Sequence, residues 1–173
     1  MLATKLLEKQ HKEVAKIFEK LEENAADAAK LVNELANSLA AHMTIEQEIF
    51  YPAIQRVDRE MVFESFEEHA LAEVALKRLL AADSEAEEFK ARVTALKELI
   101  EHHVKEEEEE LFPEVEKQIG KDELEELGAQ MKERFEAVVE AGYESAVPRG
   151  FAKTSSDVSR KVLHKGTGKR KAA

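Results

Sequence analysis

Histidine and glutamate recur at one fixed spacing in two parts of the sequence. His42 is followed four residues later by Glu46, and His103 is followed four residues later by Glu107. Residues four apart on an α-helix lie on the same face, so each pair presents an imidazole and a carboxylate in one direction. Both groups bind metal ions such as iron, manganese and zinc, and the two pairs are therefore candidate metal-binding elements.

The spacing belongs to a longer internal repeat. A proline follows each glutamate after five intervening residues, at Pro52 and Pro113, and an aromatic residue directly precedes each proline. One further histidine precedes each copy, His11 before the first and His69 before the second. The chain thus contains two similar halves, each offering His and then His-x3-Glu, which predicts a pseudo-twofold helical bundle around a paired site.

Apolar residues recur with helical spacing in five segments, which predicts an all-α, up-and-down four-helix bundle with a short fifth helix. The predicted helices span about residues 3–23 and 27–56, begin near Asp58 and Ser84, and end with a fifth at about 122–139. Ser84 with Glu87 has the pattern of a capping box for the fourth helix. Pro52 is expected to kink or end the second helix.

The histidines and glutamates of the repeat fall on the apolar faces of these helices, and this placement favours a bound cation. An ionised glutamate on a buried face is unfavourable unless a positive charge compensates it, and no Lys or Arg lies on the inner stripes. Four imidazoles and two carboxylates without sulfur suit iron or manganese, with zinc possible. The set is too large for one tetrahedral ion and suits two ions bridged by carboxylates.

The order His, His-x3-Glu, His, His-x3-Glu, with an aromatic residue and proline after each copy, resembles the hemerythrin-like (HHE cation-binding) family. The resemblance covers roughly residues 11–113 and implies a four-helix bundle with a non-haem di-iron centre. It implies a small gaseous or peroxide ligand and a role in handling or sensing oxygen, nitric oxide, peroxide or iron. In the implied ligand set, four histidines are terminal ligands and two glutamates are bridges: His11, His42, His69, His103, Glu46 and Glu107.

The sequence departs from the oxygen-carrying hemerythrins at one position. Those proteins have a second histidine four residues after the third-helix histidine, and here that residue is Glu73. The change disfavours reversible oxygen carriage, and Glu73 becomes a possible additional ligand. Two alternatives stay open: a di-iron enzyme that decomposes peroxide or reduces nitric oxide, and a helical interaction module stabilised by zinc.

Composition sets the broad class of the protein. The 173 residues include no cysteine, which excludes disulfides, Cys-ligated zinc and iron–sulfur clusters. No apolar run approaches the length that spans a bilayer and no signal peptide is evident, so a cytoplasmic protein without membrane contact is expected. Residues from Arg149 onward hold eight basic groups and one acidic group, although the whole chain carries a net charge of −11.

This charge asymmetry predicts two regions. Residues 1–145 form the metal-binding bundle, and residues 146–173 form a basic, disordered tail. The acidic body disfavours nucleic-acid binding except weakly through the tail. Three further residues are given no part in the site: His102 is expected to be exposed, and Tyr51 and Phe112 are expected to be packing residues.

Overall fold

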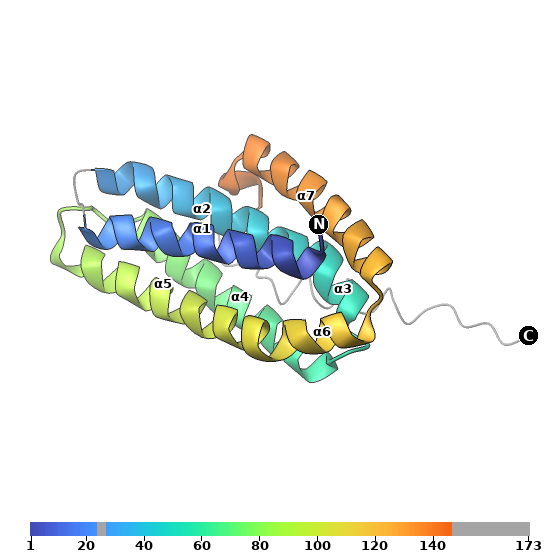
Figure 1. Cartoon of the computed structure of the whole chain (residues 1–173). Coiled ribbons are helices and arrows are strands. Elements are labelled where there is room, and N and C mark those ends of the chain that lie inside the picture. The colour runs from blue at the N-terminus through green and yellow to red at the C-terminus, as the bar shows by residue number, and fades with distance from the viewer. Residues whose placement is uncertain (24–26, 147–173) are drawn as a thin grey trace, which may run out of the picture.

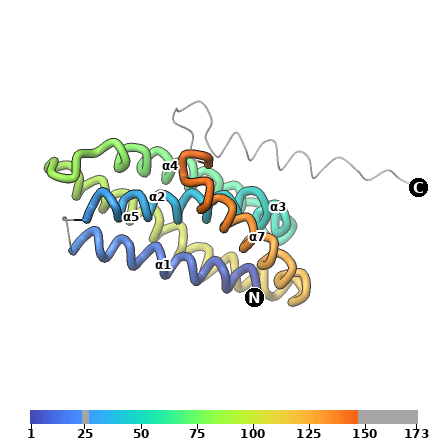
Figure 2. Tube along the Cα trace, turned by 90° about the horizontal axis from the view of Figure 1, so that it is seen from above, coloured from blue at the N-terminus to red at the C-terminus, as the bar shows by residue number. Residues whose placement is uncertain are grey.

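The computed structural model describes residues 1–23 and 27–146. Four long helices lie side by side and alternate in direction, as Figures 1 and 2 show. Their bounds are α1 Ala3–Glu23, α2 Ala28–Ile45, α4 Arg59–Leu80 and α5 Glu87–Glu106. The predicted all-α bundle is confirmed, and the described ranges contain no strand. The predicted tail lies outside these ranges apart from Ala146.

Pro52 lies near the end of the second helix, as predicted, and the helix continues past it only to Ile54. A π-helical turn, Glu46–Phe50 (η2), widens the backbone directly after α2, and α3 then runs from Tyr51 to Ile54. In this turn the amide of Tyr51 donates to the carbonyl of Glu46, five residues earlier. Proline has no N–H to donate, and the wider turn lets the helix pass it. The second half repeats the arrangement with η3, Glu107–Leu111, and α6, Phe112–Gln118.

The helix starts in the second half show one confirmed and one wrong prediction. Asp58 caps α4, and its side chain accepts a hydrogen bond from the amide of Met61 at 3.0 Å. The capping box is absent: α5 begins at Glu87 with Ala86 as its N-cap residue, and no side chain caps it. Residues 81–86 form turns instead, with Ser84 among them.

A fifth long helix, α7, spans Lys121–Ala141 and packs across α1 and α2 (Figure 1). A short 3₁₀ turn, η4, follows at Tyr143–Ser145. Gly128 lets α7 approach the start of the chain, because a Cβ at this position would collide with the carbonyl oxygen of Met1. The fifth helix therefore covers the first half of the repeat and leaves the outer face of α4 and α5 open.

Two apolar clusters hold the bundle together, and the polar residues of the repeat lie between them. Along α1, Leu7 belongs to one cluster and Val14 to the other, with His11 between them. The order is the same on α4, where His69 lies between Phe66, in the cluster of Leu7, and Leu76, in the cluster of Val14. Burial of each large apolar side chain stabilises the fold by roughly 1.5–3 kcal/mol. The free energy gained by burying these apolar side chains thus offsets the free-energy cost of burying the polar residues of the repeat. None of the described helices is long and apolar enough to cross a membrane.

Candidate metal centre

The structure brings together all six residues that the sequence singled out. Each comes from a different turn of the four long helices or their π-helical extensions, and each is between 0% and 6% exposed: His11, His42, Glu46, His69, His103 and Glu107. The four histidines form two close pairs, one in each half of the chain. The Nε2 atoms of His11 and His42 are 3.2 Å apart, and those of His69 and His103 are 3.0 Å apart.

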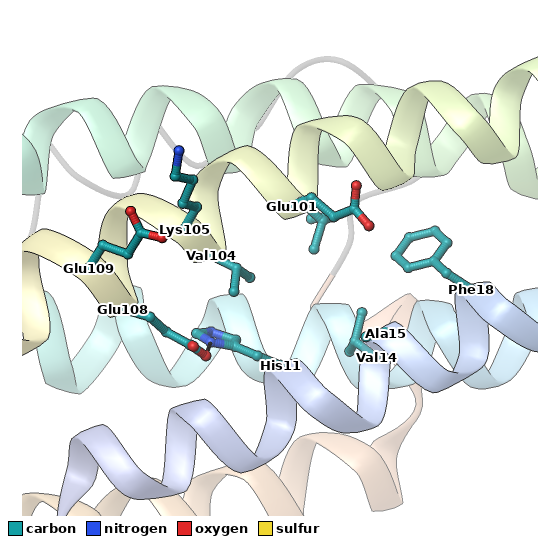
Figure 3. A pocket seen from close by; sticks show the side chains of 10 residues that line it. His11, Val14, Ala15, Phe18, Glu101, Val104, Lys105, Glu108 and Glu109 are labelled. Atoms are coloured by element: carbon teal, nitrogen blue, oxygen red, sulfur yellow. Dashed lines mark hydrogen bonds and ion pairs between the residues drawn. The ribbon is translucent and has the colours of Figure 1, made fainter.

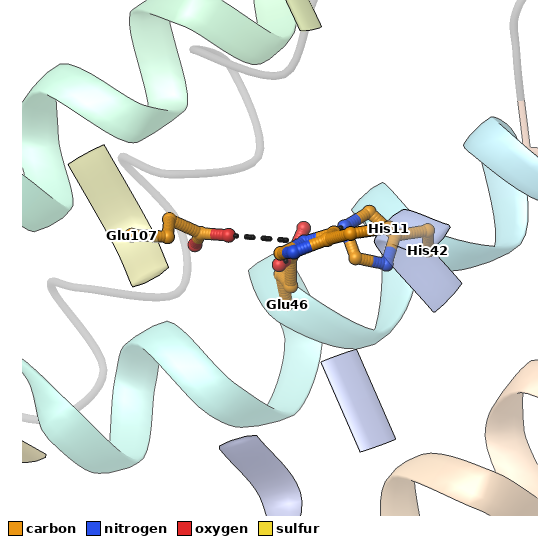
Figure 4. A group of neighbouring side chains, drawn as sticks. All are labelled: His11, His42, Glu46 and Glu107. Atoms are coloured by element: carbon orange, nitrogen blue, oxygen red, sulfur yellow. Dashed lines mark hydrogen bonds and ion pairs between the residues drawn. The ribbon is translucent and has the colours of Figure 1, made fainter. Parts of the chain in front are cut away.

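Each glutamate reaches a histidine from both halves. Glu46 places Oε1 at 3.2 Å from Nε2 of His42 and Oε2 at 3.3 Å from Nε2 of His69. Glu107 places Oε2 at 3.4 Å from Nε2 of His11 and at 3.7 Å from Nε2 of His103. Figure 4 shows Glu107 facing His11, His42 and Glu46 across the centre of the bundle. The carboxylates are thus placed as bridges between two pairs of imidazoles.

The hydrogen bonding of these carboxylates fits a cation. Three buried carboxylate oxygens accept no hydrogen bond from any described residue: both oxygens of Glu46, and Oε2 of Glu107. A buried carboxylate without donors is strongly unfavourable, whereas metal coordination satisfies it directly. The ligand atoms of two groups lie within 4.8 Å of one another, as metal binding requires: His11, His42, Glu46 and Glu107 in one, and Glu46, His69 and His103 in the other.

The outer nitrogens of the first histidine pair are held by hydrogen bonds. Nδ1 of His42 lies 2.8 Å from Oε1 of Gln10, and Nδ1 of His11 lies 2.8 Å from Oε1 of Glu108. Acceptors at Nδ1 place the proton there and leave Nε2 free to bind a metal. This pair is therefore oriented toward the centre by one amide and one carboxylate.

The second pair is held by side chains in equivalent positions, but one of its hydrogen bonds runs the other way. Nδ1 of His103 lies 2.7 Å from Oε2 of Glu68, whereas the amide nitrogen Nε2 of Gln47 donates to Nδ1 of His69 at 3.0 Å. One carboxylate and one amide therefore orient these rings too, with an acceptor at His103 and a donor at His69. Sequence reasoning missed all four of these partners. The repeat contained a signal for them, because each lies directly before a first histidine or directly after a glutamate.

The two central glutamates differ in their pKa values. Burial raises the pKa of Glu46 well above its ordinary value, and the negative charge of Glu107 raises it further. Burial acts in the same direction on Glu107, but the charge of His103 and the close contact with His11 outweigh it and lower that pKa. The metal-free centre therefore favours a protonated Glu46 beside an ionised Glu107.

The histidines differ in a matching way. Burial lowers the pKa of His42 and of His69, and the charge of the paired histidine, His11 or His103, lowers it further. Burial also disfavours the charged form of His103, but the negative charge of Glu107 and the hydrogen bond to Glu68 raise its pKa overall. Neutral imidazoles are the form that binds metals.

Tyr51 is a functional candidate that sequence reasoning took for packing. Its hydroxyl donates to Oε1 of Glu107 at 2.9 Å and lies 3.3 Å from Nε2 of His69 and 3.4 Å from Nε2 of His103. Burial raises the pKa of Tyr51, and the negative charge of Glu107 raises it further, so the phenol is neutral. The equivalent residue, Phe112, packs parallel to His11 with ring centroids 6.0 Å apart. Tyr51 thus adds an oxygen to one side of the centre only.

Two other predicted residues lie apart from the centre. Glu73 is buried, but neither group of converging ligand atoms at the centre includes it. His102 is exposed, as expected, and its Nε2 lies 3.6 Å from Glu68 and 3.3 Å from Glu106. Glu68, His102 and Glu106 form an outer group, which contacts the centre through the hydrogen bond of Glu68 to His103.

Comparison with known proteins agrees with this geometry. Residues 2–115 match the model of the hemerythrin HHE cation-binding domain, a range that holds every residue of the centre. A crystal structure of an HHE cation-binding domain-containing protein from Mycobacterium kansasii superposes with a TM-score of 0.74 at 25% identity, covering 92% of this chain and 98% of that one. A comparison with curated proteins gave no match. The repeat, the buried histidine pairs and the matched domain together show that this chain belongs to the hemerythrin HHE cation-binding family.

Proposed function

We propose that this protein binds two iron ions between its four histidines and two glutamates and uses them to handle or sense a small ligand. The observation that carries the proposal is the position of Glu46 and Glu107, each of which reaches one histidine from each half. A carboxylate in that position can bridge two ions, and two imidazoles remain for each ion. This nitrogen and oxygen donor set suits iron or manganese, and zinc less specifically.

The residues of the chain would bind the ions and keep coordination positions open. Two bound irons would supply open positions and redox chemistry toward dioxygen, peroxide or nitric oxide. Gln10, Glu68 and Glu108 would keep His42, His103 and His11 in the tautomer that binds metal through Nε2. Because position 73 on α4 lacks the second histidine of the oxygen carriers, and Glu73 lies outside the converging ligand atoms, we favour oxidation chemistry, sensing or iron handling over reversible oxygen carriage.

Anaerobic loading with Fe(II) tests the proposal directly. The iron content per chain is measured after desalting, and near-ultraviolet spectra are recorded before and after exposure to air. We expect two irons per chain and a new absorption band on oxidation. One metal ion or none, with no spectral change, would contradict the proposal and favour the zinc-stabilised interaction module.

Peroxide decomposition is a second candidate, and Tyr51 is the observation that favours it. A neutral phenol within 3.4 Å of His69 and His103 can donate a hydrogen bond or a proton to a ligand held at the centre. Peroxide consumption by the iron-loaded protein should therefore fall in Tyr51→Phe. Zinc-loaded protein is the control, and equal consumption by the zinc and iron forms would exclude the activity.

A further inference from the structure

A hollow between α1 and α5 leads from solvent toward the centre. It has a volume of about 290 Å³, and Figure 3 shows His11, Val14 and Ala15 on one side and Val104 on the other. The hydrogen-bonded pair of His11 and Glu108 lies in its wall. One ligand histidine of the centre is thus exposed to this hollow.

A second, smaller space lies directly against the centre. All four histidines line it, together with apolar side chains, and its volume is about 10 Å³. A space of this size holds about one water-sized molecule. Three apolar residues, Val14, Ile100 and Val104, line both the inner space and the outer hollow. These three side chains, with His11, which also lines both spaces, therefore form the partition between the outer hollow and the inner space.

Val104 is the most exposed of the three apolar residues in the partition. The equivalent residue in the first half, one position after His42, is Met43, which is longer and only 4% exposed. Val104 is half-buried, and its short side chain borders the outer hollow. Lys105 and three glutamates, Glu101, Glu108 and Glu109, also line the hollow. A net negative rim of this kind disfavours the approach of anions.

From these observations we propose that dioxygen reaches the centre through the α1–α5 hollow, past Val14, Ile100 and Val104, and that this partition selects small neutral ligands. The inference rests on the proposed function, because it assigns a route to the same centre. Apolar walls favour a neutral molecule, and the inner space excludes molecules much larger than two atoms. Val104 is a specificity-determining residue in this scheme and Ala15 marks the mouth of the route.

Two substitutions close the route, and a third is a matched control. Ala15→Trp fills the mouth from an exposed position, and Val104→Phe thickens the partition. Ala95→Trp fills a hollow of about 260 Å³ between α4 and α5, which no ligand residue lines. Stopped-flow oxidation of the Fe(II)-loaded protein by dioxygen should slow roughly ten-fold in both closing variants, with Ala95→Trp unchanged. The iron content should stay equal in all four proteins.

Xenon binding gives a readout that needs no iron. Xenon occupies apolar cavities, so crystals of the metal-free protein under xenon pressure should hold xenon beside Val104, and Val104→Phe should not. Equal oxidation rates in wild type and both closing variants, or xenon excluded from the wild-type hollow, would overturn the route. Those results would leave the di-iron proposal intact, whereas wild-type protein that takes up no iron would overturn the proposed function itself.

Discussion

The two halves of the bundle, residues 3–54 and 59–118, share a backbone plan and differ in polarity. Both contain His, His-x3-Glu, a π-helical turn and a proline. In the first half the residues that orient the histidines are Gln10 and Gln47, and in the second they are Glu68 and Glu108. Because one partner of each kind crosses to the other half, each histidine pair receives one amide and one carboxylate. The repeat therefore keeps its geometry and gives both histidine pairs the same kinds of orienting side chain.

The halves differ more strongly on their outer faces. Ala41 and Ile45 in the first half are fully buried in a region that α7 helps to cover. The equivalent positions in the second half are His102, which is exposed, and Glu106, which is partly exposed. Residue type thus follows coverage by the fifth helix at positions that flank equivalent ligands.

Removing either glutamate should lower the iron content most, because each glutamate contacts histidines from both halves and each histidine belongs to one pair. We expect Glu46→Ala and Glu107→Ala to hold less than one iron per chain, and His42→Ala and His103→Ala to hold one. Plasma mass spectrometry on desalted protein measures this. His102→Ala should keep both ions, and one full ion retained by either glutamate variant would argue against bridging.

Replacing Glu46 or Glu107 by glutamine should change the melting temperature of the metal-free protein in opposite directions. The folded-state pKa of Glu46 is raised, so its contribution to stability is present below its ordinary pKa of 4.5 and lost as the pH rises. Glu46→Gln should therefore raise the melting temperature at pH 7.5, by about 2–4 °C per kcal/mol relieved, with the gain shrinking toward pH 4.5. The measurement is calorimetry of chelator-treated protein.

Glu107 should behave in the opposite way. Its pKa is lowered, so its contribution is present above its ordinary value and is lost as the pH falls. Glu107→Gln should lower the melting temperature at pH 7.5, because His103 and His11 lose their negative partner. Shifts of the same sign in both variants would show that the two carboxylates are equivalent.

Exchanging a carboxylate that orients a histidine for an amide should have a smaller effect on metal binding. Glu68→Gln replaces a charge-assisted hydrogen bond of 2.7 Å to His103 and makes the second half resemble the first. We expect metal affinity to fall roughly ten-fold, measured by competition with a chromogenic chelator. Glu106→Gln, which alters an ion pair with the exposed His102, is the matched control and should bind like wild type.

The aromatic difference between the halves should have the smallest effect on stability. Tyr51→Phe makes the first half match Phe112 and removes the donor to Oε1 of Glu107. Because the acceptor is an ionised carboxylate, the free energy of unfolding of the metal-free protein in urea should fall by about 1.5–3 kcal/mol. The chain has two tyrosines, and Tyr143→Phe on η4 is the control. An unchanged value for Tyr51→Phe would mean that this hydrogen bond makes no net contribution.

The sequence by itself determined the helical class, the two halves and the six residues that converge at the centre. Helical periodicity is local, so a histidine four residues from a glutamate necessarily shares its face, and the apolar stripe shows which face is buried. The family resemblance read from those residues is confirmed by the matched domain. The assignment of the six residues as ligands stays a prediction that the metal measurements test.

The tertiary structure alone decided what surrounds those six residues. It placed Glu108 against His11 across the bundle, turned the hydroxyl of Tyr51 onto Glu107, and left Glu73 outside the converging groups. It also showed that the helix continues past Pro52 after a π-helical turn. These features depend on how separate helices are rotated and spaced against each other, which packing determines and the periodicity of one helix does not contain.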